Sequence, residues 1–342
     1  MPVYSLGDRQ VFSFTNFVGS NDKGAIAMNS FKIVDSHCDT LLKINSGETN
    51  FFTKGSSRVN LPKIIDGGVF IQFMAVYVHQ HYKPGLSLKR SLELINTFLG
   101  IVNDPRLIHI KNKEDLKHLL SNEKKIGLLL SLEGAEPIES IAVLDIFFHL
   151  GMRCIGITWN QRNMLADGCN ETGGLTHFGK EVINKMSELG ILCDVSHLSQ
   201  ASFWDVIKVT KKPIIASHSN CHALCPHPRN LTDSQIKELA QTGGVMSITF
   251  YPDFIGLNRN LDSIVKHIAH VGELVGIEHV GIGSDFDGAE FSIPNLENSS
   301  KLANLVKELK TSGFHKQEIE KILGNNIINL LKNTLPGGNH GS

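Results

Sequence analysis

The stretch "FKIVDSHCDT" occupies residues 31–40 and contains the first well-defined strand pattern in the sequence. This strand ends at His37 and Asp39, whereas the first strand of a doubly wound sheet is usually followed by a glycine-rich phosphate turn. Residues two apart on a strand point to the same face, so we expect the two side chains to converge. A His-x-Asp pair is weak evidence by itself, because a capped turn would also explain it. Its meaning depends on how the other strands end.

Seven further segments have strand character, and most are short, rich in Ile, Val and Leu, and apolar on both faces, as in a parallel sheet covered by helices. They lie at residues 69–78, 126–134, 153–159, 191–197, 213–218, 244–251 and 279–288. Amphipathic segments separate them, and helices are expected over residues 178–190, 232–243, 261–276 and 315–333. Eight strands alternating with helices predict an α/β fold of the (β/α)8 TIM barrel class. A doubly wound open sheet is the main alternative.

The chain has 342 residues, of which 41% are hydrophobic and 20% charged, and its formal net charge is -1. These values favour one large globular domain, expected over residues 28–342, and nothing indicates nucleic acid or a membrane surface as a partner. Residues 1–27 are weakly patterned and read as an N-terminal extension, with Met28 as an alternative start. They show no signal-peptide pattern, and six irregularly spaced cysteines suggest no disulfide framework, so a cytoplasmic protein is expected.

Polar residues stand at the ends of five of the eight expected strands, where barrel enzymes carry their chemistry. They are His37 and Asp39, then Glu133, His197, His218, and finally Asp285 with Asp287. Each one has an ordinary explanation as a helix cap or a core histidine. Three histidines and several carboxylates at five strand ends are together far more typical of a functional site.

Imidazole and carboxylate groups are ligands of borderline-soft divalent cations, with zinc the first choice. The set is larger than one tetrahedral ion needs, so we expect two ions about 3.5–4 Å apart. Glu133 is the expected bridge, because it comes from a middle strand and offers two oxygens. His37 and Asp39 would then hold one ion, and His197 and His218 the other.

A second metal hypothesis concerns the loop "HSNCHALCPHPR" at residues 218–229. Its cysteines and histidines are dense enough to suggest a small structural zinc site. However, Cys221 and Cys225 have no second cysteine pair at finger-like spacing elsewhere in the chain, so this hypothesis is the weaker one.

Six motifs, in order along residues 31–333, resemble the membrane (renal) dipeptidase family of zinc metallopeptidases. They are "VDSHCDT" at 34–40, "LEG" at 132–134, "DVSHLS" at 194–199, "ASHSN" at 216–220, "RNLTD" at 229–233 and "GIGSDFDG" at 281–288. The two Ser-His motifs about twenty residues apart, followed by Arg-Asn and then Asp-Phe-Asp-Gly, make the resemblance specific.

The resemblance implies a metal-dependent hydrolase barrel with two Zn²⁺ per subunit, which cleaves dipeptides through a hydroxide bridging the ions. It assigns the five expected ligands to the same two ions, with Glu133 again as the bridge. The ligands are His37, Asp39, Glu133, His197 and His218. Asp285 matches the family's acid/base residue, and Arg229 matches the arginine that binds the C-terminal carboxylate of the substrate. Family members are often homodimers and accept a D-residue at the C-terminal position.

Two departures from the family pattern stand out. Animal members carry a histidine near the substrate carbonyl, whereas the matching residue here is Trp159, with Asn160 beside it. Animal members also have a lipid-anchor signal, and because the end "LKNTLPGGNHGS" is not hydrophobic, no membrane anchor is carried over. Two other functions stay open: a barrel amidohydrolase acting on N-acyl amino acids or cyclic amides, and a non-catalytic zinc-binding homologue.

Overall fold

The computed structural model describes residues 31–338 and contains a parallel sheet of nine strands. The strands are β1 Ile33–Asp35, β2 Val69–Tyr77, β3 Leu107–His109, β4 Ile126–Glu133, β5 Met152–Gly156, β6 Leu192–Asp194, β7 Ile214–Ser219, β8 Val245–Ile248 and β9 Val280–Ile282. The helices are α1 Thr40–Asn45, α2 Leu61–Gly67, α3 Ser87–Ile101, α4 Lys113–Leu120, α5 Ile141–His149, α6 His177–Leu189, α7 Gln200–Val209, α8 Asp233–Gln241, α9 Leu261–Val275, α10 Leu302–Thr311, α11 Lys316–Glu320 and α12 Asn326–Thr334.

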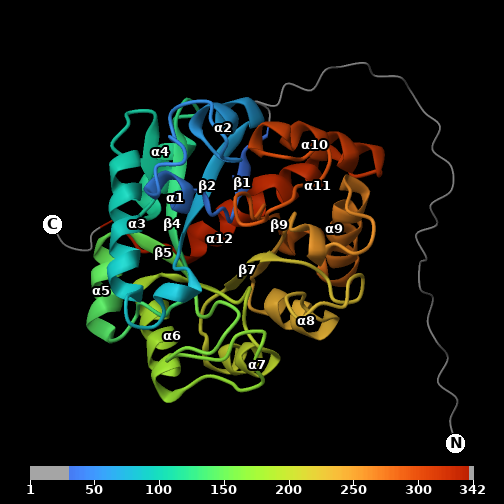
Figure 1. Ribbon diagram of the computed structural model, residues 1–342. Helices are drawn as coiled ribbons and strands as arrows, with labels where there is room; N and C mark the ends of the chain where they lie inside the picture. The colour runs from blue at the N-terminus through green and yellow to red at the C-terminus, as the bar shows by residue number, and fades with distance from the viewer. Residues whose placement is uncertain (1–30, 339–342) are drawn as a thin grey trace, which may run out of the picture.

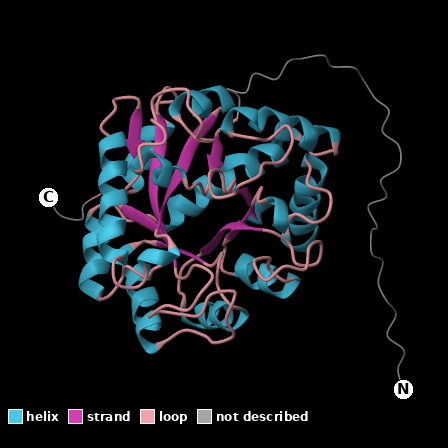
Figure 2. Ribbon diagram, viewed as in Figure 1, coloured by secondary structure: helices cyan, strands magenta, loops and turns pink. Residues whose placement is uncertain are grey.

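Eight of the strands close into a (β/α)8 barrel, as the sequence predicted. Neighbours pair in the order β1, β2, β4, β5, β6, β7, β8 and β9, and β9 returns to β1 through Asp35 and Ile282. Every pairing between strands is parallel, and the helices surround the strands (Figure 1, Figure 2). Closure brings segments from both ends of the described chain into contact.

The ninth strand, β3, was not predicted. Its three residues pair with the start of β4, Leu107 opposite Ile126, on the edge where β5 pairs further along. Three residues are too few to show a periodic pattern, so only the tertiary contact identifies this strand.

The predicted helices form close to their expected bounds, and local sequence explains their ends. Thr176 accepts a hydrogen bond from the Gly179 N–H and caps the start of α6, while Gly190 ends it with φ 72°. Thr232 caps α8 in a reciprocal capping box with Gln235. The expected helix over 315–333 is divided into α11, a π-helical segment over Lys321–Asn325, and α12.

The helix α12 packs against the hydrophobic interior of the barrel. Ile327 and Leu331 of α12 belong to one buried cluster with residues from the strands, among them Val34 and Phe73. Figure 1 shows α12 in the middle of the molecule, between strands on either side. A second and larger cluster fills the layer between the strands and the surrounding helices. The interior is therefore a packed core, and the chemistry must lie at a barrel end.

The expected extension over residues 1–27 lies outside the described residues. Within residues 31–338, no helix combines the length and apolar character needed to cross a bilayer.

Candidate active site

The structure brings all seven predicted site residues to the C-terminal end of the barrel. His37 and Asp39 follow β1, Glu133 is the last residue of β4, His197 follows β6, and His218 lies in β7. Asp285 follows β9, and Arg229 lies in the segment after β7. All seven residues are buried, and each is at most 8% exposed. A shared location for residues so far apart in the chain follows from closure of the parallel barrel.

Glu133 lies at the centre of this cluster and faces both predicted pairs of ligands. Its Oε2 atom lies 3.6 Å from His37 Nε2. Its Oε1 atom lies 2.8 Å from His197 Nε2 and 3.5 Å from His218 Nε2. The two oxygens therefore point to different groups of donors, as a bridging carboxylate requires.

His37 and two further carboxylates form the other half of the cluster. The Nε2 atom of His37 lies 3.5 Å from Asp39 Oδ2 and 4.0 Å from Asp285 Oδ1. Candidate ligand atoms of His37, Asp39 and Asp285 lie within 4.8 Å of one another, as do those of His37, Glu133 and His218. These are two overlapping three-residue groups that could each hold a cation.

Burial and charge shift the pKa values in the cluster in opposite directions. Burial lowers the pKa of His197 to about 3 and that of His218 well below its usual range, so both rings are neutral at pH 7. Burial would also lower the pKa of His37, but the charges of Glu133 and Asp39 outweigh it and raise the pKa to about 10. The site therefore combines two neutral imidazoles with a third whose pKa is raised by the neighbouring carboxylates.

Two buried atoms test whether the residues fit a metal. His37 Nε2 and Asp39 Oδ1 are buried and have no hydrogen-bond partner. An unpaired buried polar atom costs free energy, on the order of 1–3 kcal/mol, unless something else satisfies it. Imidazole nitrogen and carboxylate oxygen are the donors that zinc takes in proteins. The donor set and the unpaired atoms both fit a divalent cation at this position.

Arg229 lies beside this cluster. One of its nitrogens, Nη2, donates to the backbone carbonyl of His218 over 2.9 Å. Its Nε and Nη1 atoms are buried without a hydrogen-bond partner. The guanidinium is close enough for its charge to act on Asp285. Arg229 therefore presents unused N–H donors near the predicted ligands.

Asp285 and Asp287 have different surroundings, which the strand-end pattern alone did not distinguish, although the family resemblance assigned only Asp285 to the site. Asp285 adopts a left-handed backbone conformation, φ 60°, and its side chain joins the cluster. The carboxylate of Asp287 instead accepts hydrogen bonds from Thr40 Oγ1 at 2.6 Å, Lys43 Nζ at 3.0 Å and the backbone N–H of Arg58 at 2.9 Å. Asp287 holds neighbouring loops together, so only the first aspartate of "DFDG" belongs to the site.

The sequence analysis did not foresee the part that two residues play in the site: it did not mention Gly288, and it noted Asn160 only beside Trp159. Gly288 leaves room for two site carboxylates, because a Cβ there would lie 2.2 Å from Asp285 Oδ1 and 2.3 Å from Asp39 Oδ2. Asn160 lies with Oδ1 2.7 Å from His197 Nδ1 and so orients that ring. The glycine after "DFD" was a visible signal for the first, whereas the second depends on the contact between two strand ends.

Trp159, at the position of the family histidine, stands at the edge of the cluster. Its ring centroid lies 5.4 Å from that of Tyr77 and 6.2 Å from that of His197. The ammonium of Lys83 lies 5.4 Å from the centroids of Trp159 and Tyr77 and pairs with Glu136 at 3.0 Å. An aromatic wall therefore borders the predicted ligands on the β2 and β5 side.

The cysteines and histidines of residues 218–229 do not form the alternative zinc site. The Cys221 thiol donates to the carbonyl of His267 and the Cys225 thiol to that of Asp253, each over 3.6 Å. Among the described residues, the candidate ligand groups include none of this loop beyond His218.

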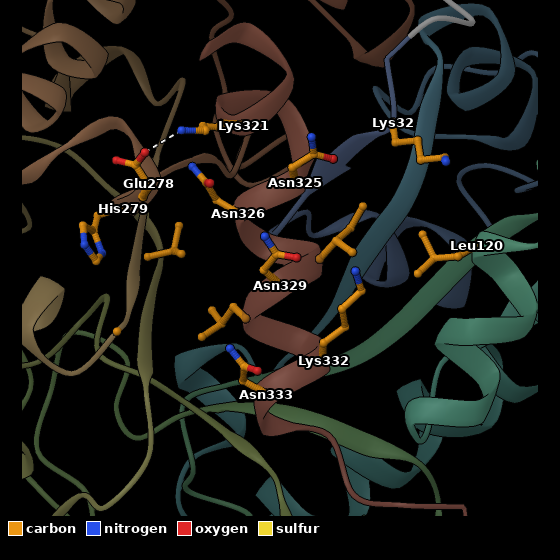
Figure 3. A pocket seen from close by; sticks show the side chains of 14 residues that line it. Lys32, Leu120, Glu278, His279, Lys321, Asn325, Asn326, Asn329, Lys332 and Asn333 are labelled. Atoms are coloured by element: carbon orange, nitrogen blue, oxygen red, sulfur yellow. Dashed lines mark hydrogen bonds and ion pairs between the residues drawn. The ribbon is translucent and has the colours of Figure 1, made fainter. Parts of the chain in front are cut away.

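A separate cavity of about 590 Å³ lies by α12 and the starts of β1, β8 and β9 (Figure 3). Asparagines and lysines line it, and Lys321 there pairs with Glu278. None of the seven predicted site residues lines this cavity. It is therefore remote from the cluster.

The barrel and its buried histidine–carboxylate cluster define a metal-dependent hydrolase. The family described as membrane dipeptidase, peptidase family M19, matches residues 23–336. An uncharacterised dipeptidase of Schizosaccharomyces pombe is 33% identical over 336 residues, covering 89% of this chain and 80% of the relative. The chain belongs to the membrane dipeptidase family and is a metallopeptidase.

Solved structures share the fold. A metallopeptidase from Rhodobacter sphaeroides, bound to a phosphinate mimic of the dipeptide L-Ala-D-Ala, has a TM-score of 0.83 and 24% identity. That similarity covers 89% of this chain and 99% of the other. A probable dipeptidase from Pseudomonas aeruginosa has a TM-score of 0.84 and 21% identity, covering 90% of this chain and 96% of the other.

Proposed function

We propose that the protein is a binuclear zinc dipeptidase, in which His37 and Asp39 hold one ion, His197 and His218 the other, and Glu133 bridges them. The observation that carries the proposal is the position of Glu133, whose two oxygens face different histidine groups. When bound, the two ions would supply Lewis acidity, which lowers the pKa of a water molecule toward neutrality and polarises a peptide carbonyl. Every other part of the reaction falls to the side chains.

Asp285 is the proposed proton carrier. Its Oδ1 atom lies 4.0 Å from His37 Nε2, next to the proposed ligands. Amide hydrolysis requires removal of a proton from the attacking water and delivery of a proton to the leaving nitrogen. One carboxylate between the two positions can do both in turn, first as general base and then as general acid.

Arg229 is the proposed recognition group for the free carboxylate of a dipeptide. Its Nε and Nη1 atoms have no partner in the protein, and burial strengthens a charge-assisted hydrogen bond to a carboxylate. A carboxylate held there places the preceding peptide bond close to the cluster. Recognition of the terminal carboxylate by Arg229 beside the cluster would restrict the enzyme to short substrates.

The proposal is tested with purified protein on a panel of L,L- and L,D-dipeptides, their C-terminal amides, N-acyl amino acids and cyclic amides. The L,D-dipeptides belong in the panel because the family resemblance implies tolerance of a D-residue at the C-terminal position. We expect cleavage of free dipeptides, its loss with a chelator, and its recovery with zinc. Turnover only of N-acyl amino acids or cyclic amides would replace this proposal, as would zinc binding without any hydrolysis.

We also propose a compartment and an oligomeric state. The six cysteines are all free, which supports a reducing compartment such as the cytoplasm. A homodimer is proposed from the family resemblance. Light scattering of the purified protein measures its mass directly, and a mass near 37.7 kDa, that of one chain, would contradict the dimer.

A further inference from the structure

Behind His218, on the side away from the predicted ion, lies a short chain of hydrogen bonds. His218 Nδ1 is 2.7 Å from Ser217 Oγ, and the Ser217 hydroxyl is 2.5 Å from Asp194 Oδ2. All three residues are buried, with exposures of 1%, 1% and 6%. Asp194 ends β6, and the other two lie in the neighbouring strand β7. These hydrogen bonds therefore join side chains from two paired strands of the barrel.

The direction of each hydrogen bond follows from what surrounds Asp194. Its Oδ1 atom accepts from the backbone N–H of Ser196 at 3.0 Å, that of Ser217 at 3.0 Å, and the Ser196 hydroxyl at 2.6 Å. The Ser217 hydroxyl donates its single hydrogen to Asp194 Oδ2. The lone pair of Ser217 then faces His218 Nδ1, which must carry the hydrogen.

A neutral imidazole with hydrogen on Nδ1 has its lone pair on Nε2. In His218 this is the atom that lies 2.8 Å from His197 Nε2 and 3.5 Å from Glu133 Oε1. The hydrogen-bond chain thus directs a lone pair into the cluster. His197 is held differently, by the side-chain amide of Asn160.

We propose that Asp194, acting through Ser217, is a positioning residue that holds His218 in the metal-binding tautomer and so sets the zinc affinity of the His197–His218 pair. The proposal rests on the assignment of His218 as a ligand under the proposed function. Partners of this kind orient metal-binding histidines, and their loss typically weakens metal binding by about 10–100-fold. Here the carboxylate acts through the Ser217 hydroxyl. Because a hydroxyl can both donate and accept, the direction of the two hydrogen bonds can be reversed.

The substitution Asp194→Asn should reverse the direction of these hydrogen bonds. Three donors converge on the position of Oδ1, so the amide oxygen must occupy that position and the amide nitrogen must take the position of Oδ2. The nitrogen would then donate to Ser217, and Ser217 would donate to His218 Nδ1. The hydrogen of His218 would move to Nε2, the atom that should bind the ion.

The experiment measures zinc affinity by competition with a chelator, and the tautomer of His218 by ¹⁵N NMR of the metal-free protein. We expect an Nδ1–H tautomer in the native protein and an Nε2–H tautomer in Asp194→Asn. We also expect about 10–100-fold weaker zinc binding in Asp194→Asn and Ser217→Ala. Circular dichroism checks the fold of each variant.

Matched controls are Ser131→Ala in β4 and Ser247→Ala in β8, which remove buried serine hydroxyls that have no hydrogen-bond partner. They should leave zinc affinity unchanged. Ser217→Ala that binds zinc like these controls, or Asp194→Asn that keeps the Nδ1–H tautomer, would overturn the proposal. His218→Ala separates the ligand assignment from the positioning role. Unchanged zinc binding in His218→Ala would refute the assignment of His218 as a ligand. Weaker zinc binding in His218→Ala together with native zinc affinity in Ser217→Ala would refute only the positioning role.

Discussion

The Nε2 atoms of His197 and His218 lie 2.8 Å apart, and both lie within 3.5 Å of Glu133 Oε1. Two imidazole lone pairs repel at this distance unless a proton or a cation lies between them. The two rings are held in this approach from behind, by Asn160 and Ser217. The protein therefore maintains an arrangement that a metal ion would stabilise.

The first prediction concerns metal content. Replacing His197 with alanine removes one of these nitrogens, so we expect metal content to fall from two zinc ions per chain toward one and dipeptide hydrolysis to be lost. Elemental analysis of the dialysed protein measures the content. His177→Ala is a matched control, because this histidine is exposed on α6 and, within residues 31–338, pairs only with Glu181. Full activity of His197→Ala with a single ion would refute the binuclear site.

The second prediction concerns the proton carrier. Asp285→Asn preserves side-chain size and suits the left-handed backbone at this position, φ 60°, because asparagine adopts it readily. We expect both ions to remain and kcat to fall by a factor of about 10²–10⁴. Steady-state kinetics beside elemental analysis separates the two effects. A rate close to that of the native enzyme would mean that another group transfers the proton.

The third prediction concerns carboxylate recognition by Arg229. Arg229→Ala should raise KM for dipeptides by about 10–100-fold, the equivalent of about 1.5–3 kcal/mol for a hydrogen bond to a charged group. The expected discriminating result is a smaller effect on dipeptide amides, which lack the carboxylate. Comparison of kcat/KM for each dipeptide and its amide provides the measurement. If the preference for the free acid survives the substitution, Arg229 does not bind the carboxylate.

The fourth prediction concerns the space at Gly288. In Gly288→Ala the new methyl group would lie 2.2 Å from Asp285 Oδ1 and 2.3 Å from Asp39 Oδ2, so the carboxylates must move. We expect about 10–100-fold weaker zinc binding and a comparable loss of activity. Gly100→Ala is the control, because that glycine lies in α3 with nothing within 4 Å of the added methyl. Equal zinc affinity in the two variants would show that the site tolerates the shift.

The fifth prediction concerns acid stability and a histidine outside the cluster. His267 of α9 is 1% exposed, its Nδ1 accepts the Cys221 N–H at 3.1 Å, and burial lowers its pKa to about 4. The unfolded chain, with a histidine pKa near 6.5, binds this proton first as the pH falls. The stabilising contribution of His267 is therefore complete above pH 6.5 and is lost as the pH falls to 4.

Urea denaturation of the metal-free protein between pH 7 and pH 4 measures this loss. His267→Gln keeps an acceptor near the Cys221 N–H but cannot titrate, so its free energy of unfolding should fall less steeply over that range. The comparison uses slopes, because the substitution also changes packing. Identical slopes in the two proteins would rule out a contribution from His267.

The sequence predicted the barrel well because parallel strands and amphipathic helices are local patterns. The alternation of short apolar segments with helical stripes placed all eight barrel strands, and capping residues such as Thr232 placed helix ends. The candidate site was visible because barrel strands end at one face, so His37 and Asp285 could be expected together. The three-residue β3 escaped detection because pairing with β4, not periodicity, makes it a strand.

The sequence by itself determined the fold class and the order in which polar strand ends follow one another. The family resemblance assigned Asp285 rather than Asp287 to the site, but only the tertiary structure decided how Asp287 is held, with its carboxylate bonded to Thr40 where the barrel closes against β1. The tertiary structure also decided the direction of the hydrogen bonds that link Asp194, Ser217 and His218. That direction depends on donors that two neighbouring strands bring together. Strand patterns are local properties of the chain, whereas these contacts join residues up to 247 positions apart and exist only once the barrel has closed.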